Sequence, residues 1–261
     1  MFSSADRCIY GKNQILETVC QFRYPAILSI ETDLPAKFQE AIREVFPRYE
    51  CKKEQPAPKV QMVPGQLPKV EQGQIVSNHC FMTADGLWRI NLTKDFIALT
   101  TRKYTAWEEF ARMLDKPLGQ FIQLYKPAYF DRVGLRYVNA FSKKELDVEH
   151  LPWRELIEDR YLGVMAEESV QETAFARCTQ DLDMALPGSC RMKLHAGPGL
   201  VQKQGETVKD PRFLLDIDVS MGGNLPVNMA AGALSTLHVH AWSVFRGAIT
   251  DNLHEAMEPG E

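Results

Sequence analysis

The stretch Tyr129–Phe141, YFDRVGLRYVNAF, guides the interpretation of the rest of the chain. Its apolar and polar residues alternate, which is typical of a β-strand with one face in the core. One face is apolar and the other carries two arginines around a glycine: Val133, Leu135 and Tyr137 against Arg132, Gly134 and Arg136. The segment therefore predicts a half-buried strand that presents an arginine pair on its other face.

The arginine pair has two interpretations. Guanidinium groups suit planar anions, so Arg132 and Arg136 could grip a phosphate or a carboxylate. Alternatively they pair with Asp216 and Asp218, which share one face of a second predicted strand, 213–221. We favour this structural network, because charges buried between two modules need partners. It predicts that Arg136→Ala strongly destabilises the fold, whereas a stable variant without function would favour the anion site.

The same aspartates could act as catalytic carboxylates or metal ligands, because a DxD on a strand places both on one face. No glycine-rich phosphate loop accompanies them, and Asp181 and Asp183 repeat the spacing in a less favourable context. His238 flanks the apolar stripe of a predicted helix, where we expect it to be half-buried and hydrogen-bonded. His240 lies about 200° around that helix, so the two cannot share a metal. We expect neither a metal site nor a cofactor.

The other elements follow from periodicity and from proline and glycine positions. The first half has the order strand, helix, strand, loop, strand, strand, helix, at 15–24, 34–46, 49–54, 55–73, 77–83, 88–102 and 105–125. Thr105 and Glu108 form a capping box for the last of these, and Pro117 kinks or splits it. The second half has a short helix, three strands and a long helix, at 153–162, 173–184, 190–195, 213–221 and 228–256, with a glycine-rich loop at 197–211.

Each half therefore ends with antiparallel strands followed by a long helix with an apolar stripe. That stripe must lie against a sheet to be hidden from water. The sequence predicts an α+β protein of two related modules, 1–145 and 146–261. Each module is expected to be an antiparallel sheet packed on a long helix, as in helix-grip folds.

Composition narrows the class of protein. The chain of 261 residues has a formal charge of −4, which gives no general attraction to nucleic acid, so nucleic-acid binding is disfavoured. It has no apolar stretch long enough for a signal peptide or a transmembrane segment. The six cysteines are widely spread without a CxxC pair, which favours reduced thiols and a cytoplasmic location.

Five spaced pieces resemble a sporadically distributed bacterial family of about 250 residues without an established activity. These pieces are Asn13-x-Ile15-x-Glu17-x-Val19 with Arg23; Thr100-Thr101-x-x-Tyr104 before Trp107 and Phe110; Arg132-Val-Gly134-Leu-Arg136-Tyr137-Val-Asn139; Leu215-Asp216-Ile-Asp218; and Leu237-His238 leading to Phe245 and Ile249-Thr250. Gln14 departs from the pattern, where a proline is expected. The patchy distribution of the family implies an accessory role, such as one in an anti-phage system.

Three functions follow as hypotheses. The first is a non-enzymatic binding or scaffold protein that contacts a protein partner through the loops 55–73 and 197–211. The second is a binder of a lipid or other hydrophobic small molecule in a cavity between sheet and helix, near Phe245 and Ile249. The third is an unrecognised enzyme that uses Arg132 and Arg136 with Asp216 and Asp218. The first has the most support, because no nucleophile motif, metal spacing or nucleotide loop is present.

Overall fold

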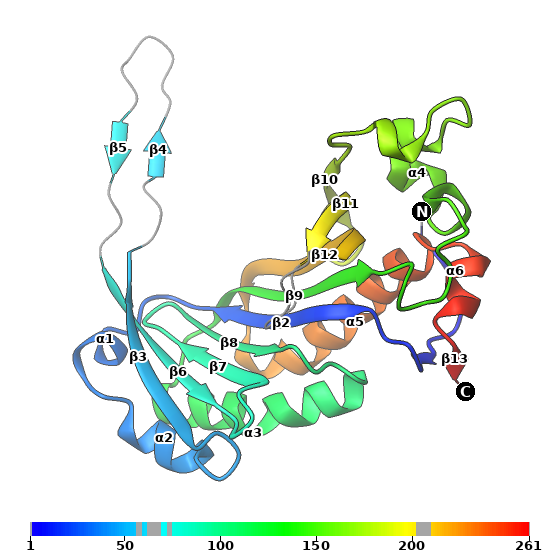
Figure 1. The fold of residues 1–261 in the computed structure, drawn as a ribbon. Coiled ribbons are helices and arrows are strands. Elements are labelled where there is room, and N and C mark those ends of the chain that lie inside the picture. The colour runs from blue at the N-terminus through cyan, green and yellow to red at the C-terminus, as the bar shows by residue number, and fades with distance from the viewer. Residues whose placement is uncertain (1, 56–58, 62–68, 72–74, 202–209, 261) are drawn as a thin grey trace.

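A nine-stranded antiparallel sheet forms the centre of the computed structural model, which describes residues 2–55, 59–61, 69–71, 75–201 and 210–260 (Figure 1). The strand order is β10-β11-β12-β9-β2-β8-β7-β6-β3. In that order the strands are Gln180–Leu186, Cys190–Val201, Asp210–Leu225, Phe130–Phe141, Ile15–Arg23, Phe96–Thr101, Trp88–Leu92, Val76–Met82 and Arg48–Glu54. The α+β class with antiparallel strands, predicted from the sequence, is confirmed, and the strands form one large sheet.

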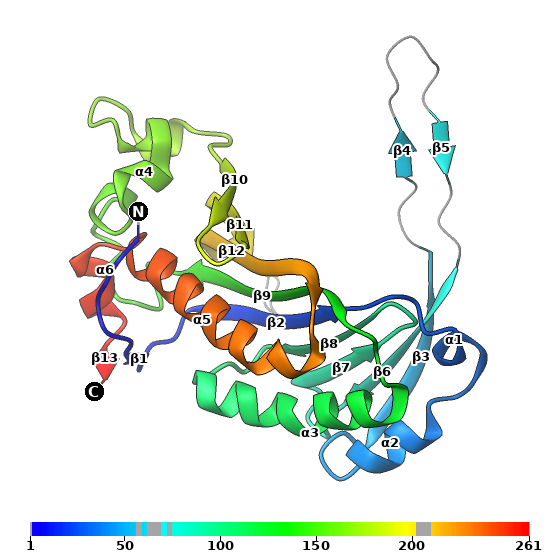
Figure 2. The ribbon, with the colours of Figure 1, turned by 180° about the vertical axis from the view of Figure 1, so that it is seen from behind.

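Helices cover one face of this sheet. The two long helices are α3 (Trp107–Tyr125) and α5 (Ala230–Arg246), and both lie on the same side of the strands (Figure 2). The shorter ones are α1 (Ser29–Thr32), α2 (Ala36–Ile42), α4 (Asp159–Leu162) and α6 (Asp251–Ala256), with 3-10 turns η1 (Trp153–Glu155), η2 (Gly163–Ala166), η3 (Glu172–Ala174) and η4 (Val227–Met229). The apolar residues of the strands alternate onto the helix side and form one continuous core.

The two halves of the chain meet in the middle of the sheet. Strands from the first half occupy the positions from β9 to β3, and strands from the second half occupy β10 to β12. The pairing of β12 with β9 joins them, so the sheet continues across residue 145 without a break. The division into two helix-grip modules therefore stays a prediction.

Two predicted elements are each divided by a short turn. The single strand predicted at 88–102 is β7 and β8, because Thr93 accepts hydrogen bonds from the backbone of Asp95 and Phe96 and closes a turn. The long helix predicted at 228–256 is α5 and α6. Between them Ile249 forms a β-bridge with Ile157, and Thr250 caps α6 by accepting from the Leu253 amide.

Several smaller predictions are wrong. Ala106 is the N-cap of α3, and the Thr105 hydroxyl bonds Glu109, so no capping box forms. Pro117 lies inside one helix, Trp107–Tyr125, so it does not split the helix in two. Residues 153–162 form η1 and α4 as separate turns, and the strand predicted from residue 173 begins at Gln180.

Both loops predicted to contact a partner contain strand residues. The ends of the glycine-rich loop belong to β11 and β12, and 202–209 lie outside the described residues. Within 55–73 the strands β4 (Lys59–Gln61) and β5 (Lys69–Glu71) pair antiparallel, and the rest is outside the described residues apart from Gln55. A second short pair joins β1 (Ile9–Tyr10) to β13 (Pro259–Gly260) near the chain ends.

Candidate functional site

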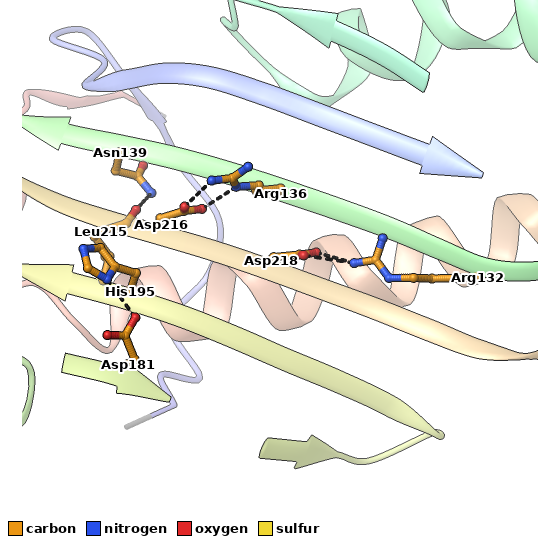
Figure 3. A network of polar contacts seen from close by, with 8 residues as sticks. All are labelled: Arg132, Arg136, Asn139, Asp181, His195, Leu215, Asp216 and Asp218. Atoms are coloured by element: carbon orange, nitrogen blue, oxygen red, sulfur yellow. Dashed lines mark hydrogen bonds and ion pairs between the residues drawn. The ribbon is translucent and has the colours of Figure 1, made fainter. Parts of the chain in front are cut away.

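The arginine strand β9 and the aspartate strand β12 are neighbours, and their charged side chains meet on the face of the sheet opposite α5 (Figure 3). Arg136 forms a bidentate pair with Asp216, with Nε 2.7 Å from Oδ1 and Nη2 2.5 Å from Oδ2. Arg132 donates from Nη2 to both carboxylate oxygens of Asp218, at 2.7 and 3.0 Å. The structure thus brings together the four residues singled out in the sequence.

The strand register does not place either arginine directly opposite the aspartate that it bonds. Asp218 lies directly opposite Arg136, and Gly222 lies opposite Arg132. Each arginine therefore extends along its strand to a carboxylate further on, as long side chains can. Asn139, from the same sequence motif, is buried and donates from Nδ2 to the carbonyl of Leu215 at 2.9 Å, which fixes the register of the two strands.

The charged side chains are partly open to solvent. Their exposed fractions are 31% for Arg132, 29% for Asp218, 47% for Arg136 and 20% for Asp216. The expectation that they are buried between two modules is wrong, because they project from the side of the sheet that α3 and α5 do not cover. Coulomb attraction is weak at such exposure, so these pairs contribute modestly to stability.

The ion pairs continue onto the two outer strands of the second half. Arg191 on β11 forms a bidentate pair with Asp183 on β10, at 2.5 and 2.7 Å. His195 lies opposite Asp181, and its Nδ1 is 2.8 Å from the carboxylate. Sequence reasoning missed both pairs, although the two-residue spacing of these aspartates equals that of Asp216 and Asp218. We call the set Arg132, Arg136, Asp181, Asp183, Arg191, Lys193, His195, Asp216 and Asp218 the charged ladder.

Two shallow depressions open on the charged ladder. One has a volume of about 690 Å³, and its lining residues include Arg23, Arg132, Arg191, Lys193 and Asp218. The other has a volume of about 350 Å³. It is lined by Arg136, Lys193, His195 and the four aspartates of the ladder: Asp181, Asp183, Asp216 and Asp218. The depressions can accept polar groups from another molecule.

The chemistry of the ladder is that of fixed charge. Hydrogen bonding to Asp216 raises the pKa of Arg136, so this guanidinium stays protonated. Its carboxylate partner already accepts two hydrogen bonds from the arginine. Across the described part of the chain, no group of three or more His, Cys, Asp or Glu side chains is arranged to hold a metal ion.

His238, the fifth predicted residue, does not join the ladder. It lies on α5, on the helix side of the sheet, where its Nδ1 is 3.0 Å from the Tyr137 hydroxyl. The prediction of a half-buried, hydrogen-bonded histidine describes it correctly. Cys190 is buried, and burial raises the pKa of its thiol, which makes it a poor nucleophile.

No protein-family model matches the chain, and no curated protein matches it significantly. Among the described residues, no helix is both long and apolar enough to cross a membrane.

Proposed function

We propose that the chain is a non-enzymatic binding protein that acts through a protein partner, and that the charged ladder is its contact surface. One observation carries this proposal: the ladder is an ordered, solvent-accessible array of arginine–aspartate pairs on the side of the sheet without the long helices. Arginines already held by carboxylates lose little freedom on binding, and arginine is enriched at protein interfaces.

The balance of charge favours a protein over a polyanion. The ladder has the cations Arg132, Arg136, Arg191 and Lys193 and the carboxylates Asp181, Asp183, Asp216 and Asp218. Neither sign dominates, so a surface with charges of both signs fits it better than a nucleic-acid backbone. We propose a cytoplasmic accessory role, in keeping with the family resemblance, and two modules whose junction is the β9–β12 pair. The loops 55–73 and 197–211 remain proposed as additional contacts.

The proposal is tested by affinity purification from the host strain with three immobilised chains. One is the native chain, and the second carries Arg136→Glu and Arg191→Glu on the ladder. The matched control carries Arg43→Glu and Arg112→Glu, which make the same charge change at exposed positions outside the ladder. We expect one protein retained by the native and control chains and lost from the ladder variant. Equal retention by all three would remove the ladder from the interface.

An unrecognised enzyme is the second candidate. The observation in its favour is that Arg136, Asp216 and Asp218 line one accessible depression next to the His195–Asp181 pair. Against it, the two arginines and two aspartates of the predicted set already bond one another, whereas a catalytic acid or base must reach the proton that it transfers. A turnover assay in which Asp216→Asn abolishes activity without a change in melting temperature would favour the enzyme.

A further inference from the structure

A separate cavity lies on the helix side of the sheet, between α5, β9 and the N-terminal segment. Its volume is about 80 Å³, several times the roughly 10–15 Å³ that one water molecule needs. Phe245 lines it, as the sequence predicted for a sheet–helix cavity, but Ile249 is held in the bridge to Ile157 instead. The volume suits a single small ring better than the long chain of a lipid.

The wall of the cavity is largely aromatic. The aromatic side chains that line it come from four separate parts of the chain, with the last two on α5: Tyr10, Tyr104, Tyr137, Trp242 and Phe245. Tyr10 lies 6.2 Å from Trp242 and 5.9 Å from Phe245, measured between ring centroids. Aromatic faces and edges pair well with another aromatic ring, so this wall favours a planar ligand.

The N-terminal segment lines one side of the cavity with residues 7–10. Its backbone runs beside α5 (Figure 2). The Trp242 indole donates to the carbonyl of Ala5 at 2.9 Å, and Ser3 exchanges two hydrogen bonds with Ser243. Arg7, which lines the cavity, forms an ion pair with Glu108 at the start of α3. The segment therefore holds the aromatic side chains of the wall in place.

His238, one of the residues that line the cavity, has a ring nitrogen without a partner. The Nε2 atom of His238 is buried and makes no hydrogen bond; within the described residues it shares this property only with the Thr18 hydroxyl. The other polar side chains of the wall are bonded: Asn13 to Tyr104 and Ile15, Gln14 to Ser142, and Asn139 to Leu215. A buried polar atom without a partner is costly, so a group in the cavity that bonds Nε2 gains affinity.

The surroundings of His238 set the chemistry of that group. Its ring stacks on Trp107, with centroids 4.4 Å apart and planes 8° apart, so its orientation is fixed. Burial lowers the pKa of His238 to about 4, which makes the imidazole neutral at pH 7. Its Nδ1 is hydrogen-bonded to the Tyr137 hydroxyl, which can act as the donor or as the acceptor. A ligand hydroxyl serves Nε2 in either tautomer, because it also does both.

We propose that this cavity binds a small, uncharged aromatic molecule that carries one hydroxyl group, and that the hydroxyl pairs with Nε2 of His238. The ring contacts the aromatic wall, and the hydroxyl completes the chain Tyr104–Tyr137–His238, whose two tyrosine hydroxyls are 3.5 Å apart. This site is on the opposite side of the sheet from the charged ladder, so it does not depend on the proposed protein partner.

Calorimetric titration of the full chain with phenol, and with toluene as the ring without a hydroxyl, tests the proposal. His238→Phe keeps the stack on Trp107 and removes Nε2, and His240→Phe makes the same change outside the cavity wall. We expect His238→Phe to weaken phenol binding on the order of tenfold, and His240→Phe to leave it unchanged. Toluene is expected to bind both variants alike. Phenol that fails to bind the native chain, or binds His238→Phe equally well, overturns the proposal.

A second measurement covers the case in which His238→Phe does not fold. Nitrogen-15 NMR of the native chain, labelled at histidine, reports each ring nitrogen directly. We expect phenol to shift the Nε2 resonance of His238 and toluene to leave it in place. A phenol titration that moves no His238 nitrogen overturns the proposal without any variant.

Discussion

The side chain of Arg132 lies along β9, over Gly134, and reaches Asp218 beyond it. Asp218 is opposite Arg136 in the strand register, and Arg136 follows Gly134 by two residues on the same face of β9. A Cβ atom at Gly134 would lie 2.7 Å from Cζ of the guanidinium, closer than real Cβ contacts. The glycine between the two arginines is therefore required by the path of the Arg132 side chain.

Gly134→Ala is expected to displace the guanidinium of Arg132 and to break its pair with Asp218. The backbone has room to stay, because the close atoms belong to the end of a flexible side chain. We expect the free energy of unfolding, from urea denaturation, to change by less than about 1 kcal/mol. In that background Asp218→Asn should cost nothing further. Gly119→Ala in α3, where no atom is near, is the control and should stabilise by about 0.5–1 kcal/mol. An undiminished cost of Asp218→Asn would contradict the role of Gly134.

A double-mutant cycle on Arg136 and Asp216 measures what their bidentate pair contributes. The sequence alone predicted strong destabilisation by Arg136→Ala. Because 47% of the arginine side chain is exposed, we now expect a coupling energy of about 0.5–1 kcal/mol from thermal or urea unfolding. A coupling of several kcal/mol would return the pair to the role of a structural lock.

The β9 and β12 segments could be predicted because their signal is local. Alternation of apolar and charged residues specifies a half-buried strand, and both strands are present with a common polar face. The histidine at position 238 was also placed correctly, because it flanks an apolar stripe. These predictions use only the period of an element, which a single sequence contains.

What the sequence lacked was tertiary information. The break between α5 and α6 depends on Ile157, a residue about ninety positions away that bridges Ile249. The exposure of the charged ladder depends on which face of the sheet the helices cover. The sequence of β9 does not specify that face, because one side of the strand is apolar and the other carries charges that can be buried as pairs. The unbonded Nε2 of His238 results from the packing of Trp107 and Tyr137 around it.

Arg212 is the charged residue whose loss should cost the most. Its side chain is only 5% exposed, and it bonds Glu145 at 2.6 Å, Asp210 at 2.8 Å and the carbonyl of Ala140 at 3.1 Å. It thus ties β12 to the end of the first half. Arg212→Met removes the buried guanidinium that bonds the carboxylate of Asp210 and the buried carbonyl of Ala140, and we expect about 3–5 kcal/mol of lost stability in urea denaturation.

The matched control for this experiment is Arg191→Met. Arg191 also forms a bidentate pair, with Asp183, but 65% of its side chain is exposed. The same substitution there should cost less than about 1 kcal/mol. Equal costs at both positions would show that burial does not decide the contribution of these arginines.

The free energy of unfolding should decrease as the pH is lowered, over a range set by the pKa values of His238 in the folded and unfolded chain. Its pKa in the folded chain is lowered to about 4 by burial, and an unfolded histidine has a pKa of about 6.5. As the pH is lowered, this histidine is therefore protonated in the unfolded chain before it is protonated in the folded chain. This contribution is complete above about pH 6.5 and is lost as the pH falls toward 4, by on the order of 3 kcal/mol.

Urea denaturation between pH 7 and pH 4 measures this loss, with His238→Phe and His240→Phe compared against the native chain. Removal of the buried imidazole should reduce the slope between pH 6.5 and 4.5, because the proton that His238 gains on unfolding is then lost. The contribution of His254, whose pKa is also lowered by burial, remains. His240→Phe should keep the native slope. The paired carboxylate of Glu31, whose pKa is lowered by hydrogen bonds from Ser77, loses its contribution only at lower pH. A slope that is undiminished in His238→Phe would assign the pH dependence to other groups.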